Sequence, residues 1–405
     1  MGTQGIRDAM PSSTALKIVP FAYGFRPFFF LAGVWAIVPM LAVAWAILTG
    51  RWPAGAPPLF TCHGHEMIFG FAGAAIAGFL LTAVPSWTGT KRVSGLPLVA
   101  LVALWIVARA EYSPLWQPTQ LWAQSLGVAF FPVLAALLAR PIVAARNFRN
   151  LPFLLFLALL FAAEWLHHAV RLGWTAPVSF NPVHLAVDTI LLVVVIVGGR
   201  IIPVFTRNAL TAAGRTVQLR ATRSIDALAI AAAAAMLVAD VVVPGSKTGG
   251  ALAGLAAVLL AVRLAGWRGW RALDMPLVWV LHVGYAWLVV GLALKSALLV
   301  GGYGWAANWL HAITLGGFGT MILGVTTRAA LGHTGRRLEA SKPIAAAYGL
   351  VSVAAILRVG VLQLLPNAAP TVLVLTVAAW VAAFGMFLWI YTPILLLPRI
   401  DGKPG

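Results

Sequence analysis

Six of the eight histidines in this sequence stand near the ends of long apolar segments, where imidazole could bind a metal. Four of them fall in the first turn of such a segment and two near the end of another. Imidazole is a ligand for copper, zinc and haem iron. The sequence therefore predicts a metal site whose ligands come from this set. The predicted ligands are His63, His65, His168, His184 and His311, with His167 as an additional candidate.

Three carboxylates occur at the same predicted depth as these histidines: Glu66, Glu164 and Asp188. Glu164 is four residues before His168 and Asp188 is four residues after His184, so each pair shares a helix face. A carboxylate that binds one ring nitrogen of a histidine turns the other nitrogen toward a metal. We therefore expect these three to support the ligands or to relay protons. The same pairing would also suit a buried, uncharged hydrogen-bond network.

The alternative to a metal site is that these histidines are interfacial residues, because histidine often occupies the first turn of a membrane helix without any further role. His63 and His65 are two residues apart, which places their rings on nearly opposite helix faces. The adjacent His167 and His168 raise the same difficulty. Three helices led by histidine, with three carboxylates at matching depth, nevertheless favour one shared polar layer. Ionisable groups inside a membrane span are by default candidates for function.

Other residues form a second tier of candidates at the opposite ends of the segments. His282 and His333 belong there, as do three arginines close to hydroxyl side chains, Arg200, Arg207 and Arg328. Anchoring to the membrane surface explains most of this pattern. A site for an anion or for a haem propionate is the alternative. Several glycines in the second and tenth segments predict close helix packing, and they would also make room for a flat macrocycle.

The composition requires a lipid environment for these segments. Of 405 residues, 61% are apolar and 9% are charged, whereas soluble domains carry about 25% charged residues. The net charge is +18, and the 28 Lys and Arg residues lie mostly in short clusters between apolar runs. This distribution does not indicate nucleic-acid binding. The single cysteine, Cys62, excludes a disulfide framework and a cysteine-rich metal site. The first apolar run is long enough to span and predicts a retained helix rather than a signal peptide.

The apolar runs, punctuated by proline, glycine and charge, predict about twelve membrane-spanning helices in an all-α fold. Their expected bounds are 28–48, 64–84, 96–109, 119–139, 151–172, 182–202, 225–243, 249–265, 275–299, 307–327, 341–364 and 371–397. With the amino terminus in the cytoplasm, most Lys and Arg fall on the inner side. The outer side receives Arg51, Arg109, Arg171 and Lys247, while Lys295 and Arg358 fall inside spans. This asymmetry predicts that both termini are cytoplasmic.

Three prolines at near-equal spacing, Pro27, Pro152 and Pro276, each open a predicted helix at its inner end. A proline in the first helical turn costs little, because its missing N–H would be unpaired there. The spacing suggests one transmembrane domain, 1–405, that contains three parallel four-helix units, 27–151, 152–275 and 276–400. The second helix of each unit begins with histidine. Chance is the simpler alternative, since membrane helices often begin with proline.

Longer motifs carry a resemblance to a known family. They are FAYGFRPFF at 21–29, HGHEMIFGF at 63–71, GFLLTAVP at 78–85, GGRIIP at 198–203 with TRN at 206–208, and GVTTR at 324–328 with LGHTGR at 331–336. Together these motifs resemble the NnrS family of bacterial inner-membrane proteins, nearly from end to end. The resemblance implies haem and copper as cofactors and a role in denitrification and the response to nitric oxide. It does not assign the metal ligands by position.

The twelve-helix, threefold layout is also similar to the catalytic subunit of haem–copper oxidases. The sequence departs from that pattern, because it has no adjacent histidine pair on a seventh helix, no HPEVY segment and no His-x-His in the tenth helix. We therefore expect a metal-dependent redox protein that is not a standard terminal oxidase. The rival classes are a polytopic transporter, in which repeats and intramembrane carboxylates are common, and a metal-independent membrane sensor.

Overall fold

The structure, a computed structural model, describes residues 19–54, 56–110, 126–220 and 222–402, and the regular structure in these ranges is helical. The first half of the chain contains α1 (Phe25–Thr49), α2 (Leu59–His65), η2 (Glu66–Ala72), α3 (Gly73–Thr88), α4 (Leu96–Ala110), α6 (Phe130–Ala144), α7 (Pro152–Arg171) and α8 (Pro182–Ala212). The second half contains α9 (Arg223–Val242), α10 (Lys247–Gly266), α11 (Pro276–Gly301), α12 (Trp309–His311), η6 (Ala312–Gly319), α13 (Thr320–His333), α14 (Lys342–Ile356), η7 (Leu357–Val361), α15 (Leu362–Leu364) and α16 (Ala369–Leu396).

Eleven continuous helical stretches in the described chain are long and apolar enough to cross a membrane, which confirms a polytopic all-α membrane protein. The predicted third span, α4, is apolar but shorter than the others. A crossing is still required there, because α3 and α6 run to the same end of the bundle. Asn147, just after α6, donates to the carbonyl of Trp87 in α3 at 3.0 Å. The fourth expected span, 119–139, begins outside the described residues, and its described part starts at Leu126.

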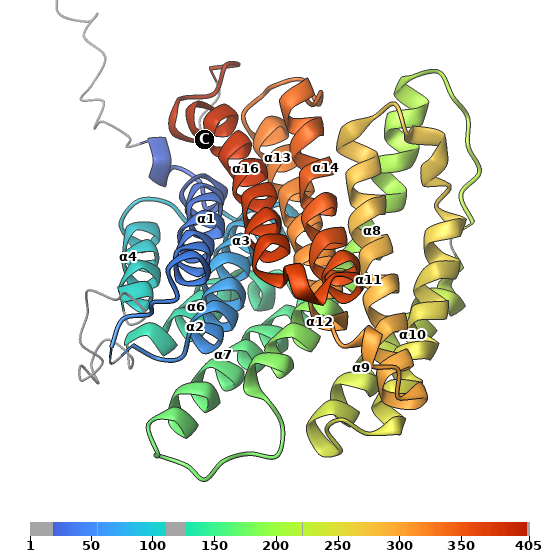
Figure 1. Cartoon of the computed structure of the whole chain (residues 1–405). Helices are drawn as coiled ribbons and strands as arrows, with labels where there is room; N and C mark the ends of the chain where they lie inside the picture. Colours follow the sequence, from blue (N-terminus) through green and yellow to red (C-terminus); the bar gives the residue numbers. More distant parts are fainter. Residues whose placement is uncertain (1–18, 55, 111–125, 221, 403–405) are drawn as a thin grey trace, which may run out of the picture.

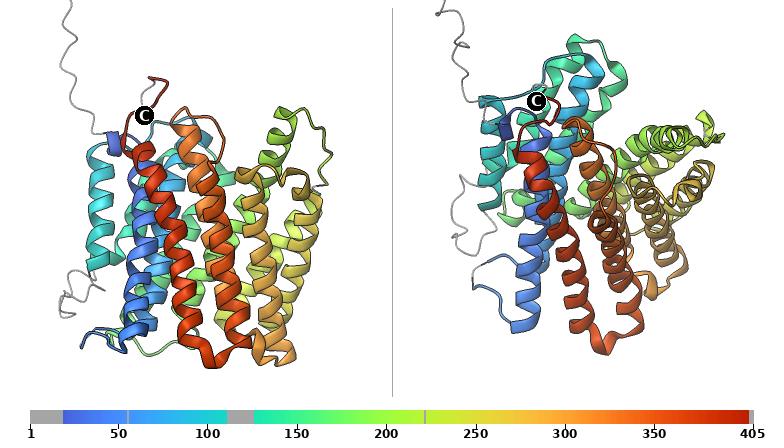
Figure 2. Two further views of the ribbon diagram at one scale, coloured as in Figure 1. Left: turned by 45° about the horizontal axis from the view of Figure 1, so that its top comes forward. Right: turned by 90° about the horizontal axis from the view of Figure 1, so that it is seen from above.

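The two ends of the described chain lie at the same end of the bundle, where α1 and α16 run side by side (Figure 1; Figure 2). The guanidinium of Arg26 at the start of α1 donates to the carbonyls of Leu395 and Leu397, both at 2.8 Å. Chain ends on one side require an even number of crossings. The opposite end of the bundle, which contains the first turns of α2 and α8 together with α12, is called the histidine end below.

Helices α9 and α10 form an antiparallel pair that packs beside α8 and α11, at the side of the bundle away from α1 (Figure 1). Apolar side chains from α1 to α16 nevertheless form one continuous buried core. The helix starts follow from local sequence. Pro152 and Pro276 are the first residues of α7 and α11, and the side chain of Asn181 caps α8 by accepting from the N–H of Val183 at 2.9 Å.

Small residues allow close approach of helices in the second half of the bundle. A side chain at Gly291 in α11 would collide with Ile313 of η6, and one at Gly284 would collide with Met321 of α13. In the other direction, Gly317 packs against Leu288. Protein atoms therefore fill the space beside these glycines, which supports the predicted role in helix packing.

The helices that begin at Leu59 and at Trp309 share an unusual feature. In each, a π-helical segment starts directly after a histidine: η2 follows His65 and η6 follows His311. The equivalent first turns of α8, which contain His184, are regular α-helix. Wide turns of this kind occur frequently at functional sites because they displace side chains from regular helical positions. The threefold repeat stays a prediction. The second helices of the three proposed units differ, because two of them contain a π-helical segment and α8 does not at the equivalent position.

Candidate metal centre

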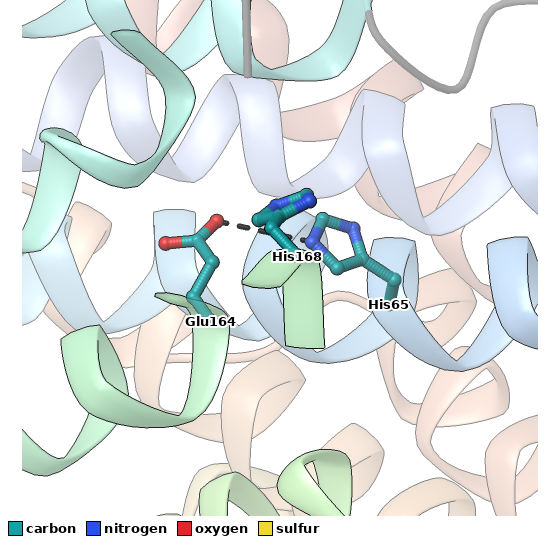
Figure 3. Close-up of side chains that lie close together, drawn as sticks. All are labelled: His65, Glu164 and His168. Carbon is teal, nitrogen blue, oxygen red and sulfur yellow. Dashed lines mark ion pairs between the residues drawn. The ribbon is translucent and has the colours of Figure 1, made fainter. Parts of the chain in front are cut away.

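Three of the predicted site residues form a compact buried cluster at the histidine end: His65, Glu164 and His168. One possible ligand atom from each lies within 4.8 Å of the others, and all three residues are at most 2% exposed. His65 ends α2, whereas Glu164 and His168 occupy one face of α7 (Figure 3). A metal bound at about 2.0–2.1 Å to each would hold these atoms slightly closer together. Small movements of these side chains would bring the three ligand atoms to metal-binding distances.

The ring of His65 is oriented by its sequence neighbour. Its Nδ1 lies 2.8 Å from Oε1 of Glu66, and its Nε2 lies 3.9 Å from Oε1 of Glu164. A carboxylate on Nδ1 makes that nitrogen the protonated one and leaves Nε2 as the ligand atom that faces Glu164. The pair of adjacent residues therefore provides one ligand and the group that fixes its tautomer.

Glu66 is itself held by two side chains from other helices. The indole N–H of Trp35 donates to its Oε2 at 2.6 Å, and the guanidinium of Arg109 contacts both oxygens at 3.2 Å. The second guanidinium nitrogen of Arg109 lies 3.7 Å from Glu164. Because Arg109 is only 5% exposed, its charge is balanced by these buried carboxylates rather than by water.

His167 and Arg171 complete the cluster from α7. The ring of His167 has its centroid 5.1 Å from that of His65, and the ring of His168 lies at 5.2 Å. Both adjacent histidines therefore reach His65, although only His168 belongs to the compact group. A guanidinium nitrogen of Arg171 lies 3.5 Å from Nδ1 of His168. Two guanidinium groups thus reach this region, Arg109 at the carboxylates and Arg171 at His168.

His63 and His311 form a separate pair at the same end. Their rings are nearly parallel, at 8°, with centroids 6.4 Å apart, which leaves a gap between them. Nδ1 of His63 is buried without a hydrogen-bond partner in the described chain. His63 and His65 point to opposite faces of their helix, as predicted, and each face has a partner. His63 packs against His311, and His65 packs against α7. The two sequence neighbours therefore belong to two different sites.

His184 and Asp188 lie apart from both histidine groups. They line a cavity of about 240 Å³ together with Asp240, Lys295 and Trp309. Asp188 is 3% exposed. The ring of His184 has its centroid 5.8 Å from the ring of Trp309. The predicted helix-face pairing of His184 and Asp188 thus faces a cavity rather than the compact cluster around His65.

The remaining sequence candidates lie toward the other end of the bundle. The Nε2 of His282 is 2.9 Å from the hydroxyl of Thr206, and His333 packs against the rings of Tyr23 and Phe25. Arg200 donates to Asn150 at 3.2 Å, Arg328 lies over the ring of Phe205, and Arg207 is exposed. The structure does not bring these five residues to the metal cluster.

Four residues that matter at the histidine end were not among the sequence candidates: Trp35, Arg109, Asp240 and Lys295. A signal existed for Lys295, because it is a basic residue inside an apolar span. Arg109 ends a short apolar run, and this position predicts only a charge on the outer side. No sequence spacing connects Trp35 with Glu66 or Asp240 with Lys295, because these contacts join different helices.

Comparison with known proteins gives one finding. A family model described as NnrS protein matches residues 19–399 of the chain. No curated protein matches this chain.

Proposed function

The chain belongs to the NnrS family, and we propose that it is a metal-dependent redox protein of the membrane that binds nitric oxide or handles its metal–nitrosyl products. The observation that carries this proposal is the buried group of His65, Glu164 and His168, with Glu66 holding the ring of His65. The resemblance of the sequence motifs to the family supplies the ligand, nitric oxide, and the link to denitrification and nitrosative stress.

Copper fits the donors of this group. Two imidazoles and one carboxylate are ligands that copper and non-haem iron accept, and they leave coordination positions open for a small molecule. We propose His65 and His168 as the imidazole ligands and Glu164 as the third donor or as a proton acceptor beside the metal. When bound, copper would supply one-electron redox chemistry and an open position for nitric oxide.

His63 and His311 bring two imidazoles from different helices together at the histidine end. Imidazole nitrogens are ligands for haem iron, and the centroids of the two rings are 6.4 Å apart. The buried Nδ1 of His63, which has no partner in the described chain, is a donor atom available to such a metal. We propose that this pair holds the haem implied by the family resemblance.

The chain's own groups orient the proposed copper ligands before nitric oxide binds. Trp35 and Arg109 fix the carboxylate of Glu66, which in turn fixes His65. Burial excludes bulk water from the group, so a ligand that is small and uncharged is favoured over a hydrated ion. These contacts bind and orient the metal ligands, and they leave Glu164 close enough to exchange a proton with the site.

An apolar cavity deeper in the bundle suits a diatomic ligand. Its volume is about 90 Å³, and Phe29, Ala72, Ile190, Val194, Phe318 and Met321 are among the residues that line it. This volume is too small for a macrocycle, since pockets for drug-sized ligands measure about 300–1,000 Å³. It accommodates a small uncharged molecule such as nitric oxide. The lining residues belong to α1, η2, α3, α8, η6 and α13, so the cavity lies between helices from both halves of the chain.

The cellular location forms part of the proposal. The structure gives a multi-pass membrane protein, and we propose the bacterial inner membrane with both termini in the cytoplasm. The histidine end would then face outward, because the described chain begins and ends at the opposite end (Figure 1).

Purification from cells supplied with haem and copper tests the proposal through metal analysis and an optical spectrum. We expect copper in the preparation and a haem absorption band that His311→Ala removes while the copper content stays unchanged. A colourless, metal-free preparation would contradict the proposal and favour a transporter. His333→Ala, at the other end of the bundle, is the matched control and should keep both metals.

A further inference from the structure

A third buried polar cluster, formed by Asp188, Asp240 and Lys295, contains neither a metal-ligand triad nor a simple ion pair. Lys295 in α11 forms a hydrogen-bonded ion pair with Asp240 in α9. Asp188 in α8 lines the same cavity as Asp240 and Lys295. Lys295 and Asp188 are 2% and 3% exposed. Three helices thus each bring one ionisable group to the same place.

The charges of this cluster do not balance if all three groups are ionised. The charged residues that act on Asp188 in the described chain are Lys295 and Asp240, and together the three groups would carry one net negative charge. An unbalanced charge in a membrane span is costly. His184 lies one turn before Asp188 on α8, and the ring of Trp309 lies 4.6 Å from Nζ of Lys295. The cluster therefore needs one further positive charge.

The cavity beside the cluster gives that charge a route from solvent. Its rim contains the exposed residues Asn181, Pro244 and Gly245, which lie at the ends of helices. The volume of about 240 Å³ holds several water molecules, each of which occupies about 30 Å³ in the liquid. Oδ1 of Asp188 is buried and has no hydrogen-bond partner in the described chain, and Asp188 lines this cavity.

We propose that Asp188, Asp240 and Lys295 form a proton-exchange site, in which one carboxyl proton is shared between the two aspartates and exchanges with water in the cavity. In the resting site, the carboxylic O–H of Asp188 donates to the carboxylate of Asp240, which also accepts from the ammonium of Lys295. Exchange breaks the O–H bond of Asp188 and forms an O–H bond on a cavity water, giving a carboxylate and a hydronium ion. Atoms and charge balance without any other reactant.

A metal ion or an anion fits the cluster less well than a proton. The ammonium of Lys295 already pairs with Asp240 and would repel a divalent cation placed between the carboxylates. The two carboxylates would repel an anion. Sodium is the remaining monovalent alternative, because it would also supply one positive charge. The experiment below separates sodium from the proton.

Infrared spectroscopy of the purified full-length protein tests the proposal, because a protonated carboxyl group absorbs apart from a carboxylate. We expect the wild type to contain one acid band that belongs to this site. Asp188→Asn and Asp240→Asn should each remove it, since the remaining carboxylate then pairs with Lys295. Lys295→Met should instead add a second acid band, because two carboxyls without a cation both take up protons.

The exposed pair of Arg215 and Asp274 provides the control, and Asp274→Asn should leave the acid bands unchanged. Retained helical circular dichroism would verify folding of each variant. An acid band that survives both aspartate substitutions would overturn the proposal. A wild type without this band, whose carboxylate bands shift when sodium is replaced by a bulky organic cation, would also overturn it and would identify sodium as the occupant.

Discussion

Two buried clusters at the histidine end of the bundle use similar residue types for different chemistry. Around His65, imidazoles gather beside Glu164, and Glu66, held by Arg109, orients the ring of His65. Around Lys295, two carboxylates surround one ammonium, and the imidazole of His184 lies at the cavity wall. In the first cluster, imidazole nitrogens lie close to a common point, as metal ligands do. In the second, ionisable groups whose charges do not balance line a water-accessible cavity.

The difference shows that depth in the membrane does not by itself define a site. Histidines at one level separate into the cluster of His65 and His168, the pair of His63 and His311, and the cavity wall at His184. What distinguishes these groups is the partner that each ring receives from other helices. The partner of His65 is a carboxylate that fixes its tautomer, whereas the partner of His184 is the ring of Trp309.

The largest expected effect is the loss of metal from His65→Ala. Removing this ligand also releases Glu66 from its role, so we expect copper content to fall to the background level. His184→Ala is the matched substitution in the other cluster and should keep the full copper content. Metal analysis of the two purified variants makes the comparison. Equal copper in both would contradict the separation of the two clusters.

Loss of both aspartates should destabilise the protein without affecting metal binding. The double variant Asp188→Asn/Asp240→Asn leaves the ammonium of Lys295 buried without a counter-ion, which costs about 3–5 kcal/mol. Adding Lys295→Met should recover much of that stability, because no buried charge remains. Denaturation in detergent measures the change. If the double variant is as stable as the wild type, Lys295 does not depend on these carboxylates for its charge balance.

A smaller effect is expected at the carboxylate that orients His65. Glu66→Gln keeps the size of the side chain but weakens its hold on Nδ1 of His65 and its pairing with Arg109. Substitution of such supporting groups typically lowers metal affinity about 10–100-fold. Competition with a chelator measures this affinity. An unchanged affinity would show that the tautomer of His65 is set by something other than Glu66.

The smallest effect is expected for the exposed ion pair of Arg215 and Asp274, where both side chains are about half exposed. Hydrogen bonds from Arg215 lower the pKa of the Asp274 carboxyl. The stabilisation is therefore present above the usual aspartate pKa and is lost as the pH falls through the lower folded value. Water screens this pair, so we expect Asp274→Asn to leave the thermal midpoint at pH 7 unchanged. A clear shift there would contradict the contrast between exposed and buried pairs.

The sequence was sufficient to predict the helices, because membrane spans are set by local apolar length. It also placed Glu164 and His168 on one helix face, since their spacing of four residues is a property of a single helix. It could not predict that Arg109 and Trp35 hold Glu66, or that Asp240 pairs with Lys295, because helix packing determines those contacts. Because His184 and His65 have the same predicted depth in the membrane, the sequence predicts that they bind one metal. In the structure His184 lies instead beside Trp309 and Lys295, away from His65.

X-ray absorption at the copper edge of the purified protein tests the central claim most directly. We predict a first shell of nitrogen and oxygen atoms with the outer-shell signature of two imidazoles, as His65, His168 and Glu164 would provide. The spectrum should contain no sulfur scatterer, because Cys62 lies outside this group. A sulfur atom in the first shell, or a copper without imidazole ligands, would contradict the assignment of the metal to this cluster.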